Sequence, residues 1–82
     1  MDQAKELKLH NPLSFDFIYT WFDDKNEGHE IKLQSGQFTT LPYDQAMFMA
    51  KHLADAIYMD RGCQNYEEHP KIMNEVIQYD LV

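Results

Sequence analysis

The segment between Pro42 and Gly62 constrains the fold most, because it is an uninterrupted run of helix-compatible residues with a boundary signal at each end. Pro42 ends an extended run, and Asp44 is well placed as an N-cap residue. Gly62 stands at the C′ position, where helices commonly end. The pattern therefore predicts one long helix over residues 44 to 61.

The predicted helix has two apolar sides. The first is a continuous stripe suited to packing on a sheet, and it consists of Ala46, Met47, Ala50, Leu53, Ala54 and Ile57. The second consists of Phe48, Met49, His52, Ala56 and Met59. Only a narrow polar sector around Lys51 and Asp55 remains. One sheet cannot cover both sides, so the second side needs a separate explanation.

Two interpretations of the second side remain open. In the first, the residues after Pro70 form a shorter helix whose apolar stripe, Ile72, Met73, Val76 and Ile77, covers it. In the second, the side is an exposed surface for a protein partner or for a second copy of the chain, because methionine adapts to contact surfaces and large apolar patches mark interfaces. The partner-binding residues would then be Phe48, Met49, His52 and Met59.

Strands are expected before the helix. Residues 14 to 22 alternate with period two, and their aromatic face is expected to pack through Phe17, Tyr19 and Trp21 on Ala50, Leu53 and Ile57 of the helix. Residues 30 to 34 alternate again after a charged loop and predict a hairpin, and residues 37 to 41 predict a third strand of a meander.

The N-terminal residues 1 to 12 are polar and of mixed charge, and we predict that they form an arm. Residues 13 to 82 would form a single domain, because a chain of 82 residues has room for one core. The predicted fold is α+β: a small antiparallel sheet of two or three strands packed on one long helix, with a short C-terminal helix.

Composition excludes several classes of function. Asp and Glu number 14 against 7 for Lys and Arg, and the net charge of −7 disfavours direct binding of nucleic acid. No apolar run approaches the roughly 20 residues that span a bilayer, so no membrane association is expected. The single cysteine and the absence of an apolar leader segment favour a protein that is not secreted through a signal peptide.

No catalytic, metal or cofactor motif stands out. His52 and Asp55 could form an imidazole–carboxylate pair, but such neighbours are common on helix surfaces and no nucleophile flanks them. Cys63 and His69 do not supply enough ligands for a metal. The three widely spaced glycines cannot build a phosphate loop. We therefore expect no enzyme activity, no cofactor, no metal and no small-molecule substrate.

The strand FDFIYTWF, the acidic loop after it and the segment GQFTTLPYDQAMFMAKHLADAIY resemble the small virion-structural or accessory proteins of tailed bacteriophages. The resemblance covers roughly residues 15 to 62. It implies a non-enzymatic subunit that docks onto larger virion proteins, located in the virion or in the host cytoplasm.

These observations predict a non-catalytic protein–protein interaction subunit, a small structural component of a larger assembly. The alternative is an acidic inhibitor or nucleic-acid mimic that binds a host enzyme through carboxylates. The two hypotheses differ in what the fold should show, because an inhibitor of this kind needs its carboxylates gathered on one face.

Overall fold

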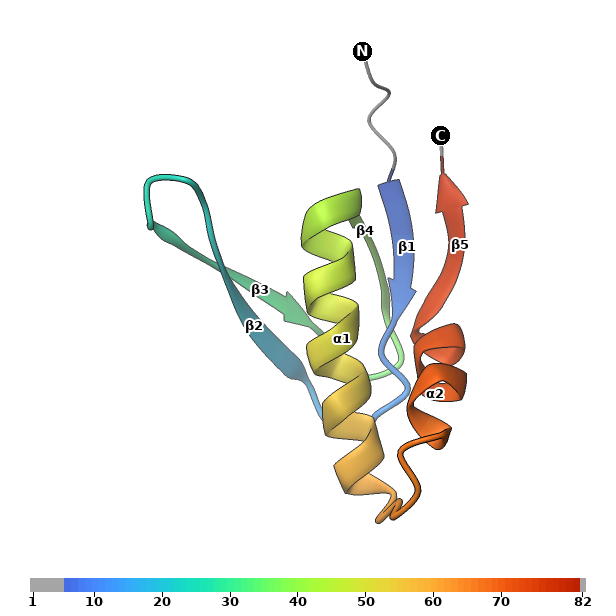
Figure 1. Cartoon of the computed structure of the whole chain (residues 1–82). Coiled ribbons are helices and arrows are strands. Elements are labelled where there is room, and N and C mark those ends of the chain that lie inside the picture. Colours follow the sequence, from blue (N-terminus) through green and yellow to red (C-terminus); the bar gives the residue numbers. More distant parts are fainter. Residues whose placement is uncertain (1–5, 82) are drawn as a thin grey trace.

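The strands and helices form an α+β fold, as predicted, in a computed structural model that describes residues 6 to 81 (Figure 1). The elements in chain order are β1 (Glu6–His10), β2 (Phe17–Phe22), β3 (Gly28–Leu33), β4 (Phe38–Pro42), α1 (Tyr43–Asp60), α2 (Glu68–Val76) and β5 (Ile77–Leu81). They make a three-stranded sheet, a separate two-stranded hairpin, one long helix and one short helix.

β1 is the central strand of the three-stranded sheet, which has the order β4-β1-β5 and is antiparallel throughout. Its alternate residues Leu7 and Leu9 are buried in the core. The prediction of an N-terminal arm over residues 1 to 12 is therefore wrong for residues 6 to 10, because a strand with neighbours on both sides satisfies its backbone and buries one face. Residues 1 to 5 lie outside the described residues.

β2 and β3 form the predicted hairpin, with a register that runs from Phe17 opposite Leu33 to Phe22 opposite Gly28. The hairpin leans on α1 at its base and extends away from the body of the molecule toward its turn (Figure 1). The predicted three-stranded meander is wrong, because β4 pairs with β1 instead of with β3.

The long helix begins and ends one residue earlier than predicted, at Tyr43 and Asp60. Pro42 occupies the cap position without a side-chain hydrogen bond, so Asp44 is not the N-cap but an acidic residue in the first turn, where the helix dipole favours it. Gly62 follows the helix with φ of 67°, the left-handed conformation expected at C′.

The C-terminal segment forms a helix and then a strand. Pro70 lies in the first turn of α2, where its missing N–H costs little, and Ile72 and Val76 are buried. The helix ends at Val76, and Ile77 begins β5 opposite Leu9. The predicted helical stripe therefore divides between two elements.

The core lies mainly between α1, the three-stranded sheet and α2. Its buried apolar residues are Leu7, Leu9, Leu13, Leu33, Ala46, Met49, Ala50, Leu53, Ala54, Ile57, Ile72 and Val76. Phe17 and Tyr19 pack against this cluster while staying partly exposed. The predicted packing of Trp21 on the helix stripe is wrong, since Trp21 is not among the residues that pack against this cluster. Its ring lies beside that of His29 instead, with the centroids 5.9 Å apart.

Candidate protein-binding surface

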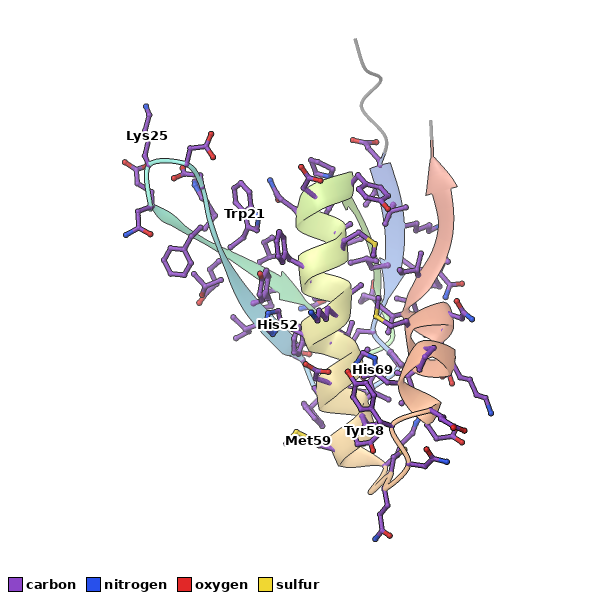
Figure 2. All side chains as sticks on the ribbon, in the orientation of Figure 1. Trp21, Lys25, His52, Tyr58, Met59 and His69 are labelled. Carbon is purple, nitrogen blue, oxygen red and sulfur yellow. The ribbon has the colours of Figure 1, made fainter. Side chains whose placement is uncertain are left out.

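The outward side of α1 carries three of the four predicted partner-binding residues. Phe48 is 54% exposed and Met59 is 75% exposed, and His52 is exposed as well. We call Phe48, His52 and Met59 the helix ridge. Figure 2 shows His52 on the hairpin side of α1 and Met59 near the C-terminal end of the helix. Exposed apolar side chains that gather in one patch mark contact surfaces.

The fourth predicted residue, Met49, does not belong to this surface. Its side chain is fully buried in the core cluster, so the prediction that it binds a partner is contradicted. The two sequence-based interpretations therefore each describe part of the helix. Met49 is enclosed within the domain, whereas Phe48 and Met59 stay uncovered.

His52 is held in place by the hairpin. Its imidazole stacks on the ring of Tyr19, with centroids 5.0 Å apart and an interplanar angle of 28°. One face of the ring is thereby covered and the residue as a whole remains exposed. The contact joins the middle of β2 to the middle of α1.

A groove of about 300 Å³ opens beside Phe48. Met47 and Met73 contribute apolar walls, and Asp44 and Lys51 place one charge of each sign at its rim. Phe48 belongs to both the groove and the helix ridge, so the two features form one continuous surface. The groove has room for an apolar side chain of a partner.

The imidazole–carboxylate pair of this region involves residues other than those considered from the sequence. Asp55 pairs with His69 of α2, with His69 Nε2 lying 2.7 Å from Asp55 Oδ1, and not with His52. His69 is buried, and its ring stacks on that of Tyr66 with centroids 4.9 Å apart. Figure 2 shows His69 near Tyr58. Tyr58 borders the same cluster. The pair fastens α2 to α1, and no sequence signal joined residues on two separate helices.

One group of side chains has the spacing of metal ligands. Donor atoms of Asp23, Glu27 and His29 lie within 4.8 Å of one another at the turn of the hairpin. The Asp23 carboxylate already accepts backbone N–H groups of Lys25 and Glu27 and lies 2.9 Å from His29 Nε2. The hydrogen bond with His29 and the backbone bonds lower the pKa of Asp23. The closeness of these side chains is thus explained by the hydrogen bonds of Asp23 that close the turn.

Several carboxylates are paired and distributed over different elements. The pairs are Asp16 with Lys32, Asp23 with His29, Asp55 with His69, Glu68 with Lys71 and Glu75 with Arg61. They belong to the hairpin, to α1 and to α2. This distribution differs from a single acidic face.

Comparison of the chain with protein-family models, with curated proteins and with solved structures finds no match. Within residues 6 to 81, neither helix combines the length and the apolar character that a membrane span requires.

Proposed function

We propose that this chain is a non-catalytic protein-binding subunit, a small structural component of a larger assembly such as the virions implied by its resemblance to tailed-phage proteins. The observation that carries the proposal is the helix ridge with its adjoining groove. Phe48 and Met59 project from a helix whose opposite side already fills the core. The ridge is thus free to contact another protein without any change of the fold.

The partner expected at this surface is a protein that inserts an apolar side chain between Met47 and Met73 and packs around Phe48. Anchors of this kind supply most of the binding energy of an interface, and the neighbouring polar residues mainly exclude water. Asp44 and Lys51 at the rim favour a partner that places a positively and a negatively charged side chain beside them, and so contribute specificity.

The paired carboxylates favour this proposal over an acidic inhibitor. A phosphate mimic presents a row of uncompensated negative charges on one surface. Here Asp16 beside the hairpin pairs with Lys32, and two carboxylates of α2, Glu75 and Glu68, pair with Arg61 and Lys71. The inhibitor remains the alternative proposal.

The test places a photo-crosslinking phenylalanine derivative at position 48 of the tagged chain and, as a matched control, at position 38. Phe48 and Phe38 have similar exposure, 54% and 50%, but lie on α1 and β4 respectively. In an extract of the native source, the label at 48 should yield one defined protein adduct. The same label combined with Met59→Ser should yield much less of it.

Equal adduct patterns from positions 48 and 38, or no adduct from 48, would contradict the proposal. A stability control accompanies the experiment. Because both side chains are exposed, replacing Phe48 and Met59 together by Ser should change the free energy of unfolding by no more than about 0.5 kcal/mol per site. Thermal unfolding of the double variant measures this change.

A further inference from the structure

The β2 strand has an edge without the protection that natural edge strands carry. Its six residues, FIYTWF, include no charge, no glycine and no proline. Native sheets shield such edges with lysines, prolines or bulges, because an open apolar edge pairs with other chains. The partner strand β3, by contrast, carries His29, Glu30 and Lys32. Within residues 6 to 81, β3 is the only strand that pairs with β2.

The hydrogen-bond pattern of the hairpin shows which backbone groups are open. The backbone N–H of Asp23 donates to the carbonyl oxygen of Glu27 at 3.1 Å and thereby closes the hairpin. Because pairs alternate along an antiparallel ladder, Trp21, Tyr19 and Phe17 direct their N–H and C=O groups toward β3. The same groups of Phe22, Thr20 and Ile18 therefore point away from β3, to the free edge.

The side chains at this edge are apolar and exposed. Ile18 and Phe22 are 54% and 58% exposed, whereas Phe17 and Tyr19 turn toward the core cluster. A two-stranded hairpin is at most marginally stable in water, and only the base of this one leans on α1 (Figure 1). Both the backbone and the side chains of β2 thus lack part of the environment that stabilises a strand.

We propose that β2 pairs antiparallel with β2 of a second copy of this chain, so that two hairpins join into one four-stranded sheet. In a two-fold arrangement centred on Thr20, the open N–H groups of each β2 strand donate to the open C=O groups of the other, and Ile18 lies opposite Phe22 of the second copy. Pairs of aromatic and β-branched residues across strands are favourable. A six-residue strand gives a contact about 20 Å long.

The neutrality of β2 and its self-complementary register favour a second copy as the occupant. Two chains of net charge −7 repel each other, so an interface between them has to be neutral, and β2 is. Of the carboxylates that flank the strand, Asp16 lies 3.6 Å from Lys32 and Asp23 lies 2.9 Å from His29 Nε2. Pairing of β2 with β3 of another copy would instead be open-ended and would set Glu30 and Lys32 against the apolar strand.

The test is a pair of proline variants at directly opposite positions. Thr20 and Glu30 face each other in a pair whose backbone groups both point outward, so proline at either site spares the β2–β3 ladder. Thr20→Pro blocks the β2 edge, and Glu30→Pro blocks the β3 edge. We expect sedimentation equilibrium to show a dimer of the 9.8 kDa chain for the parent and for Glu30→Pro, and a monomer for Thr20→Pro.

A second pair of variants, without proline, tests the same interface in case the proline variants misfold. Thr20→Lys sets two like charges opposite each other in the dimer and should dissociate it, whereas Thr20→Val should leave it intact. Hydrogen exchange adds a residue-level measurement. The amides of Ile18, Thr20 and Phe22 should gain protection on dimerisation, while that of Tyr19 is protected in monomer and dimer alike.

A parent chain that stays monomeric at millimolar concentration would overturn the proposal. So would dissociation by Glu30→Pro but not by Thr20→Pro, or growth into open-ended oligomers. The proposal does not rest on the helix ridge, and Phe48→Ser should leave the dimer unchanged. Failure of either proposal is therefore visible independently of the other.

Discussion

The side-chain amide of Asn11 donates a hydrogen bond of 2.9 Å to the carbonyl oxygen of Leu33, and so ties the end of β1 to the end of β3. The same amide donates to the carbonyl oxygen of Phe15, and the side-chain oxygen of Asn11 accepts the backbone N–H of Leu13. Asn11 is completely buried. One side chain thereby connects the three-stranded sheet to the base of the hairpin.

Asn11→Asp should destabilise the protein by at least about 3 kcal/mol, although it hardly changes the volume of the side chain. The new carboxylate would face two carbonyl oxygens, Phe15 and Leu33, without a proton to donate. Urea unfolding measures the loss, and Asn74→Asp at an exposed position of α2 is the control. The gap to the parent should narrow at low pH, where a protonated carboxyl can donate one bond again. An equal effect of both variants would contradict this role.

Leu9→Ala should cost about 2 to 5 kcal/mol, because Leu9 is fully buried in the central strand and its removal leaves a cavity. Met59→Ala removes a side chain of similar size from the surface and should cost less than about 0.5 kcal/mol. Thermal unfolding compares the two variants. Similar melting temperatures for both would show that β1 is not part of the core.

Asp55→Ala should cost about 1 to 3 kcal/mol, because it leaves the buried Nε2 of His69 without its partner. Asp60→Ala, at the exposed end of the same helix, is the matched control and should have little effect. Chemical denaturation gives both values. An Asp55→Ala variant with the same free energy of unfolding as the parent would contradict this role of Asp55.

The ion pair between Arg61 and Glu75 should give a small, pH-dependent contribution. Hydrogen bonds from the Arg61 guanidinium, at 2.9 and 3.0 Å, lower the pKa of Glu75 from its usual 4.5. A carboxyl whose pKa is lowered by folding stabilises the fold at pH values above its pKa in the unfolded state. This stabilisation is lost as the pH falls through its pKa in the folded state. Because both side chains are exposed, solvent screening limits the effect to about 1 kcal/mol.

Glu75→Gln should therefore be slightly less stable than the parent at pH 7 and equal to it well below pH 4.5. Unfolding curves across this range compare the two, with Glu67→Gln as the control for the loss of one charge. A stability difference between Glu75→Gln and the parent that grows as the pH falls would contradict this prediction.

Elements with local signals could be predicted from the sequence. Pro42 and Gly62 bracket the long helix, and the alternation of residues 17 to 22 with the charged loop after it identifies the hairpin. Both depend on residues that are close in the chain, which is the information that a sequence pattern carries.

Elements that depend on distant residues could not be predicted. The segment Glu6–His10 is short and charged, and it forms a strand by pairing with β4 and β5 on either side. Its two leucines do not indicate this pairing by themselves. Ile77 continues the apolar spacing of α2, which predicts a helix, although pairing with Leu9 places it in a strand. The same reason explains Met49, since helical spacing does not show where the covered side of α1 ends.

The position of β1 has a consequence for how the chain acquires its structure. Residues 6 to 9 pair with residues 77 to 81, so the sheet joins segments from nearly opposite ends of the described chain. The hairpin and α1 need only local contacts and can form first, whereas pairing across so long a loop is slow. Until β5 arrives, one edge of β1 stays unpaired. Folding of this small domain should therefore be limited by a late, long-range step, and a partner that holds residues 77 to 81 would delay completion of the sheet.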